Sequence, residues 1–181
     1  LRGGELRHYD PTGGFSVVSG VPQVVARGQG GLLDVARAQD FSTRRTLFIS
    51  YAKPVGTGAA TALARAHLSL DGTRLEGLRE LFVMNRATTS KHHFGGRIVE
   101  ARDGTLFLTL GERGEQDEAQ NPATYNGSIV RLHRDGKPLL NAQDLNGLPE
   151  LWSIGHRNPQ GAALDRNGKL WVAEHGAKGG D

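Results

Sequence analysis

Short runs of apolar and β-branched residues, separated by turn residues, dominate the hydrophobic pattern of the chain. In Ser128–His133 apolar and polar side chains alternate, so that one face of the segment can be buried while the other contacts water. Asp-Gly and Asn-Gly pairs accompany such runs at Asp71–Gly72, Asp103–Gly104 and Asn167–Gly168. Because these pairs suit the tight hairpin turns that require positive φ, the pattern predicts an all-β fold of short antiparallel strands.

Two sequence elements recur along the chain, always in the same order. In each element, the second and third copies are 64 residues apart. The first element occurs at Thr46–Ser50, Arg102–Thr109 and Arg166–Ala173, and the second at Leu6–Asp10, His67–Thr73 and Arg131–Lys137. A four-stranded antiparallel unit that recurs in this way is typical of a β-propeller blade.

The length of the chain limits how many blades it can form. At roughly 60 residues per unit, the 181 residues hold about three blades, whereas closed propellers have four to eight. Three blades alone would leave strand edges exposed. We therefore expect residues 1–181 to be a partial β-propeller, with an opening strand before Leu1 and further blades after Asp181.

Leu32–Gln39 is the one segment in which we predict a helical turn or two.

Composition and charge exclude several classes of protein. Hydrophobic residues make up 37% of a chain with 26 glycines, and no apolar run is long enough to span a membrane. The net charge of +3 is scattered, so nucleic acid is not an expected partner. Without cysteine, the chain forms no disulfide and no thiolate site.

Two segments carry the most promising chemistry, Lys91–Arg97 and Gly155–Gly161. Each places a cation, an imidazole and glycines just before a β-prone stretch. Loops of a rigid sheet present such groups to ligands, and glycines allow a close approach of the backbone. This arrangement predicts a binding site for an anionic, planar ligand.

Five motifs resemble those of the glucose/sorbosone dehydrogenase family, specifically its soluble aldose sugar dehydrogenases that use pyrroloquinoline quinone (PQQ). In family order along the chain, they are Gly28–Asp34, His92–Arg97, Gly111–Glu112, Gly155–Gly161 and Glu174–Asp181. The family's fold is a six-bladed β-propeller. The resemblance therefore implies that this chain covers about three of six blades, in agreement with the repeat.

The resemblance also implies roles for individual residues. His93 corresponds to the general base that takes the proton from the sugar's anomeric hydroxyl while hydride passes to the quinone. An imidazole with a pKa of about 6.5 is a neutral acceptor near pH 7, which suits this step. Arg157 corresponds to a residue that lies against the reacting quinone oxygen, where charge develops. Asn158 and Gln29 correspond to polar contacts with cofactor and substrate.

A calcium ion anchors the quinone in the family, and the carbonyls of Gly176 and Ala177 fall at its site. The family usually has proline at the position of Ala177, but a backbone carbonyl is the ligand, so alanine should serve. His92 stands where related soluble glucose dehydrogenases carry Asp, which leaves the hydrogen-bond partner of His93 open. The basic residues that clamp the cofactor's carboxylates are expected beyond Asp181.

Other polar and aromatic residues have simpler interpretations. The acidic stretch Glu112–Glu118 is interpreted as a solvated surface rather than as a metal site. Trp152 and Trp171 are expected in the β core, and His156 and His175 are expected to shape loops.

Together with these residues, the resemblance implies a quinoprotein oxidoreductase that converts the C1 hydroxyl of aldose sugars to the lactone, with PQQ as hydride acceptor and Ca²⁺ as its anchor. Its expected partners are the sugar and an electron acceptor, either a quinone or a small redox partner, and its expected location is the periplasm or outside the cell. Two alternatives stay open: a non-catalytic propeller that binds carbohydrate or protein, and a calcium-dependent lactonase of propeller type.

Overall fold

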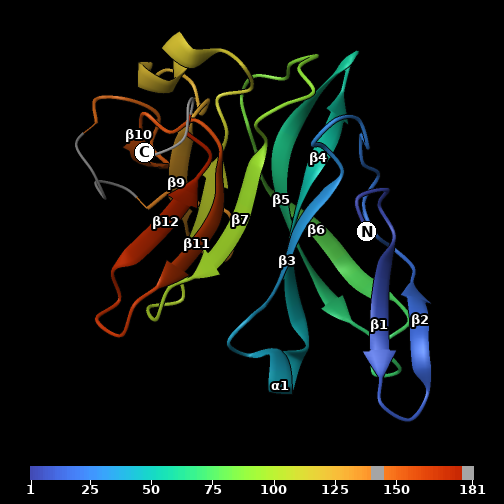
Figure 1. Cartoon of the computed structure of the whole chain (residues 1–181). Helices are drawn as coiled ribbons and strands as arrows, with labels where there is room; N and C mark the ends of the chain where they lie inside the picture. Colours follow the sequence, from blue (N-terminus) through green and yellow to red (C-terminus); the bar gives the residue numbers. More distant parts are fainter. Residues whose placement is uncertain (140–144, 177–181) are drawn as a thin grey trace.

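The computed structural model describes residues 1–139 and 145–176, and strands dominate it (Figure 1). Within these ranges the helical elements are a single turn, α1 (Phe41–Arg44), and a short 3-10 helix, η1 (Gln116–Gln120). In the same part of the chain, no helix has the length and apolar character needed to cross a bilayer. The predicted all-β class is confirmed.

The strands form two four-stranded sheets and two hairpins, all antiparallel (Figure 1). The first sheet consists of β3 (Leu32–Arg37), β4 (Thr46–Val55), β5 (Gly58–Leu68) and β6 (Leu75–Val83). The second consists of β7 (Gly95–Glu100), β8 (Leu106–Leu110), β9 (Ser128–Leu132) and β10 (Leu151–Ile154). The hairpins are β1 (Leu6–Asp10) with β2 (Gly14–Val18) and β11 (Pro159–Leu164) with β12 (Leu170–Glu174).

Hairpin turns account for the sequence repeat. Gly104 and Gly168 have φ values of 80° and 81° in the turns β7–β8 and β11–β12, in the left-handed region that glycine adopts without strain. Asp103 tightens the first turn, because its Oδ1 accepts hydrogen bonds from Thr105 N at 3.0 Å and Thr105 Oγ1 at 2.7 Å. The predicted unit of two turn-linked strands, a long loop and a further strand is present in β7–β10.

The inner strands β3, β7 and β11 lie side by side, so the sheets are arranged like neighbouring blades of a propeller (Figure 1). Asp34 on β3 accepts a hydrogen bond from Ile98 N at 2.9 Å and pairs with Arg97 Nη1 at 3.0 Å. Arg97 Nε in turn donates to Gln160 O on β11 at 3.2 Å. These links tie three strands that are far apart in sequence. The number of blades in a closed ring stays a prediction.

The helical prediction for Leu32–Gln39 is wrong. This segment contains β3, which pairs with β4 in a register that runs from Leu32 opposite Tyr51 to Arg37 opposite Leu47. Pairing with an apolar neighbouring strand and the use of Asp34 between blades override the weak local periodicity.

The main core lies between the two four-stranded sheets. Phe48 and Leu63 from the first sheet and Leu108 and Val130 from the second belong to one cluster and are fully buried. Trp152 packs in a second cluster, as predicted, with its ring 5.4 Å from that of Phe107. The core prediction for Trp171 is wrong in this structure: it is 65% exposed, since β12 is the outer strand of a two-stranded hairpin.

Candidate active site

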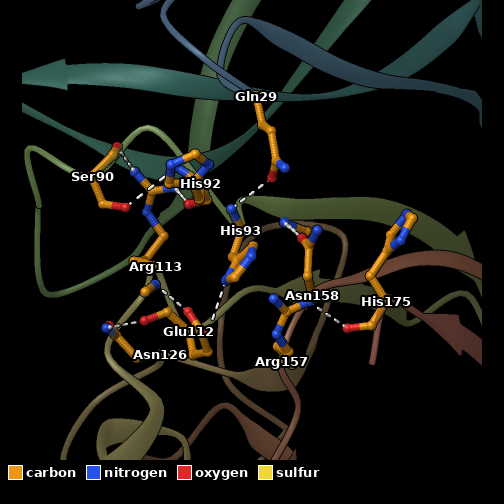
Figure 2. Close-up of polar contacts among 12 residues, drawn as sticks. Gln29, Ser90, His92, His93, Glu112, Arg113, Asn126, Arg157, Asn158 and His175 are labelled. Atoms are coloured by element: carbon orange, nitrogen blue, oxygen red, sulfur yellow. Dashed lines mark hydrogen bonds and ion pairs between the residues drawn. The ribbon is translucent and has the colours of Figure 1, made fainter. Parts of the chain in front are cut away.

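Loops that lead into the inner strands meet at the end of the molecule opposite α1 (Figures 1 and 2). Gln29 precedes β3, His93 precedes β7 and Arg157 precedes β11, so the three side chains occupy equivalent positions at intervals of 64 residues. Because the inner strands are neighbours, Gln29, His93 and Arg157 come together although they are distant in sequence. The region around these three residues is called the mouth of the site.

The backbone of His93 is tightly held. Its φ of 54° lies in the left-handed region, which costs a non-glycine residue energy. His93 N donates a hydrogen bond to Gln29 Oε1 at 2.7 Å (Figure 2). On the other side Gly111 lies so close that a Cβ there would be 1.9 Å from His93 O. These contacts fix the direction in which the imidazole leaves the loop.

The imidazole of His93 is paired with Glu112, since Nδ1 lies 2.7 Å from Oε1 (Figure 2). The side chains are 14% and 2% exposed. An ionised carboxylate can only accept hydrogen bonds, so the ring proton lies on Nδ1 and the lone pair on Nε2 is free to accept a proton. A buried carboxylate also stabilises the imidazolium that forms when the ring takes up that proton.

Several further contacts fix Glu112. Its Oε2 accepts a hydrogen bond from Gly114 N, and its backbone oxygen accepts one from Asn126 Nδ2 at 3.1 Å. Its backbone nitrogen donates to Arg157 O at 2.9 Å and so joins the His93 pair to the Arg157 loop. The interpretation of Glu112 as a solvated acid is wrong, because it is 1% exposed. The Gly111–Glu112 motif was the one signal in the sequence that could have identified it.

Arg157 reaches across the mouth toward the end of β12. Its Nη1 donates to His175 O at 2.9 Å and to Gly176 O at 3.2 Å, and its backbone nitrogen donates to Glu174 Oε2 at 2.9 Å. Its Nε is buried and has no hydrogen-bond partner among residues 1–139 and 145–176. A donor in such a position is suited to an acceptor supplied by a ligand.

Asn158 is buried in the wall of the site, where it joins two neighbouring segments by hydrogen bonds. It is 1% exposed, its Oδ1 accepts a hydrogen bond from Gly95 N at 3.2 Å, and its backbone oxygen accepts one from His175 N at 3.3 Å. The structure thus brings together His93, Arg157, Gln29, Asn158 and Gly176. Ala177, the second predicted calcium residue, lies outside the described residues.

A cavity of about 330 Å³ opens beside these groups, with Glu112, Arg157, Glu174 and Gly176 in its wall. Its wall contains one guanidinium and two carboxylates beside small residues such as Ala119 and Gly155. Among the described residues, no cluster of three or more His, Asp or Glu side chains is placed to hold a metal ion.

Three of the residues with simpler interpretations behave as surface or loop residues. Glu115 and Glu118 form ion pairs with Arg86 at 3.3 and 3.0 Å. His156 Nε2 lies 2.8 Å from Ser153 Oγ, and its Nδ1 lies 3.5 Å from Glu174 Oε1. The acid stretch and His156 therefore support neighbouring loops.

Comparison with known proteins identifies the family of the chain. The model of the family "Glucose / Sorbosone dehydrogenase" matches residues 1–181. The chain is 41% identical to the aldose sugar dehydrogenase YliI of Escherichia coli K12, over 100% of the chain and 50% of that protein. The apo-form crystal structure of the soluble aldose sugar dehydrogenase from Escherichia coli superposes with a TM-score of 0.94 at 40% identity, covering all of this chain and 54% of that one.

A second solved structure is the PQQ-bound form of an aldose sugar dehydrogenase from Streptomyces coelicolor. It superposes with a TM-score of 0.83 at 27% identity, over 96% of this chain and 51% of that one. The chain thus spans about half the length of the relatives it matches. With a family model that matches from the first residue to the last, the chain belongs to the glucose/sorbosone dehydrogenase family.

Proposed function

We propose that the intact protein oxidises the C1 hydroxyl of aldose sugars to the lactone, with PQQ as the hydride acceptor. The observation that carries this proposal is the pairing of His93 with buried Glu112 at a mouth lined by Arg157 and Gln29. Membership of the family and the PQQ in the Streptomyces coelicolor relative support it.

The residues at the mouth fit a quinone cofactor. The buried Nε of Arg157 has no acceptor among the described residues, and a quinone or carboxylate oxygen would supply one. Gln29 uses its amide oxygen on His93 N, so its amide nitrogen is the group that can contact cofactor or sugar. When bound, PQQ supplies an electrophilic carbon that takes up two electrons as hydride.

The chain's own contribution is to move a proton and to stabilise charge. His93 Nε2 accepts the proton of the sugar hydroxyl, while Glu112 holds Nδ1–H and stabilises the imidazolium. Arg157 provides a fixed positive charge in a partly water-excluded wall, where it acts more strongly than in bulk water. The hydrogen bond from His93 N to Gln29 fixes the backbone of His93, so that the imidazole is held at a constant position relative to the substrate.

For calcium, we propose the carbonyls of Gly176 and Ala177 as ligands. Backbone carbonyls are oxygen ligands of the kind Ca²⁺ prefers. Gly176 O also accepts a hydrogen bond from Arg157 Nη1 at 3.2 Å, and a carbonyl oxygen has a second lone pair with which it can bind an ion. Gly176 is the one proposed ligand among the described residues, so these residues do not by themselves complete a calcium site.

We further propose that the electrons leave through a quinone or a small redox partner, and that the protein works in the periplasm or outside the cell. Cell fractionation of the natural host, with activity measured in each fraction, tests the location. Recovery of the protein in the cytoplasm alone would contradict it.

The test of the main proposal is a dye-linked assay of the purified intact protein with glucose, PQQ and Ca²⁺. We expect oxidation that depends on PQQ, and His93→Gln should lower kcat by about 100-fold or more while PQQ binding persists. His133→Gln, at an exposed turn on the other end of the sheet, is the control. No oxidation of any aldose would favour a binding propeller, and chelator-sensitive hydrolysis of a lactone would favour a lactonase.

A further inference from the structure

A buried cation, Arg113, lies directly behind the His93 loop. Arg113 is 1% exposed, has a φ of 62°, and follows Glu112 in the turn after β8. We propose that Arg113 is a positioning residue, which holds the loop of residues 90–94 so that the imidazole of His93 meets Glu112. The inference deepens the proposed function, since it rests on His93 as the base.

The guanidinium contacts the loop both before His93, at Ser90 and His92, and after it, at Phe94. Arg113 Nη2 donates to Ser90 O at 2.9 Å, and Nη1 donates to His92 O (Figure 2). Its planar group also lies 3.3 Å from the centroid of the Phe94 ring. Phe94 is 2% exposed, and its own carbonyl accepts a hydrogen bond from Thr61 Oγ1 at 2.9 Å. The contacts therefore bracket the base from residue 90 to residue 94.

One turn thus fixes both members of the catalytic pair. Glu112 holds the ring of His93, and Arg113 holds the backbone that carries that ring. Since the two residues are adjacent in the chain, a shift of the turn moves the carboxylate and the imidazole together. This coupling preserves their separation when the neighbouring loops adjust to a ligand.

The charge of Arg113 is retained despite its burial. Burial lowers the pKa of Arg113 to about 10, and the negative charges of Glu112 and Glu115 act in the opposite direction. The group is therefore still a cation at neutral pH. A buried cation is costly unless its donors are satisfied. The two loop carbonyls satisfy Nη1 and Nη2, whereas Nε has no partner among the described residues.

Lysine can take over this function only in part. A guanidinium presents several donors in one plane and can stack on an aromatic ring while it bonds two separate carbonyls. An ammonium group is a point charge without a face to stack. Arg113→Lys therefore keeps the charge but not the geometry, and Arg113→Met keeps only the length of the side chain.

The test uses the intact protein and two measurements, the ring ¹⁵N signals of His93 without cofactor and kcat per PQQ-loaded site. The signals are assigned by difference with His93→Gln. We expect Arg113→Met to change the His93 ring from the Nδ1–H tautomer to a mixture and to lower kcat about tenfold to a hundredfold, with KM changed less than about threefold. Arg113→Lys should show the same changes to a smaller degree.

Arg45 supplies a matched control at the other end of the sheet. It also has positive φ, at 53°, and its Nε donates to Leu68 O at 2.9 Å and Ser69 O at 3.1 Å. Its guanidinium lies 5.4 Å from the centroid of the Phe41 ring. Arg45→Met should lower Tm without affecting the His93 signals or kcat per loaded site.

Wild-type ring signals in both Arg113 variants would overturn the inference, whatever the sugar assay gives. If Arg113→Met does not fold, Arg113→Lys decides alone by the same criterion. If the wild-type protein oxidises no aldose but the ring signals change in the variants, the proposed function fails and the positioning role stands.

Discussion

At the scale of residues, the site depends on a short chain of contacts around one imidazole. Glu112 binds the ring of His93, Gln29 binds its backbone, and Arg113 binds the carbonyls next to it. Each contact uses a different kind of group, a carboxylate, an amide and a guanidinium. None can replace another, so single substitutions should have separable effects on ring orientation, loop position and charge.

Glu112→Gln tests the carboxylate itself. An amide can donate to Nδ1 as well as accept from it, so the ring loses its tautomer preference and the imidazolium loses its counter-charge. We expect kcat to fall by about 100-fold or more, with a smaller change in KM, in steady-state kinetics of the intact enzyme. Glu118→Gln removes an acid that pairs with Arg86 and should leave kcat unchanged. An unchanged kcat in Glu112→Gln would show that His93 acts without the carboxylate.

At the scale of elements, aspartates at the turns hold the hairpins of each blade. Asp103 bonds Thr105 in the β7–β8 turn, and its Oδ2 lies 2.7 Å from Arg131 Nη2. Arg131 in turn lies over the rings of Phe107 and Trp152. The turn is thereby attached to the side-chain packing of its own sheet. In the β11–β12 turn, Asp165 Oδ1 likewise accepts hydrogen bonds from backbone nitrogens, those of Asn167 and Lys169.

The turn at Asp103 should give a pH-dependent contribution to stability. Hydrogen bonds from Thr105, aided by the charge of Arg131, lower the pKa of Asp103 below its ordinary value of 3.8. The stabilisation is therefore complete above the ordinary pKa and is lost as pH falls through the lower, folded-state pKa. Asp103→Asn should be less stable than wild type at pH 7, and the difference should shrink steadily below about pH 4.

Urea unfolding from pH 7 to pH 2.5 measures this difference. Asp117→Asn, in the acidic stretch, is a control for the general effect of losing one carboxylate. A gap between wild type and Asp103→Asn that stays constant through this range would contradict the linkage.

At the scale of the whole molecule, stability rests on the core between the two four-stranded sheets. Phe48, Leu63, Leu108 and Val130 are fully buried there and belong to one cluster, and β3 and β7 are neighbours at the same junction. Side chains in a well-packed interior resist displacement, so the strands that carry the site loops are held rigidly. Apolar side chains are instead exposed on the outer hairpin β1–β2, where Phe15 is 73% exposed.

Leu108→Ala should destabilise the protein by about 2–5 kcal/mol, because it leaves a cavity between the sheets. The measurement is the free energy of unfolding in urea. Leu70→Ala, at a site that is 91% exposed, should change it little. Since Leu108 is remote from the reacting groups, kcat per folded, loaded site should persist, and a proportional loss of kcat would show that the core controls the site directly.

Much of this organisation could be predicted from the sequence, and the exceptions have physical causes. The repeat, the hairpin turns and the loops of His93 and Arg157 follow from local patterns. The local pattern predicts helix at Leu32–Gln39, whereas pairing with β4 makes Leu32–Arg37 a strand. Glu112 belongs to the Gly111–Glu112 motif, but its contact with His93 and that of Arg113 with the same loop cross about 20 residues, so no local pattern predicts these contacts.

The equivalent positions of Gln29, His93 and Arg157 have a consequence for how such a catalyst can arise. In a chain built from repeats of one segment, the loop before each inner strand offers the same backbone position, and these positions lie at the same end of the molecule. Each copy needs only a change of side chain to acquire its own task. Here an amide, an imidazole and a guanidinium occupy that repeated position, so one backbone arrangement carries three different kinds of chemistry through the choice of side chain alone.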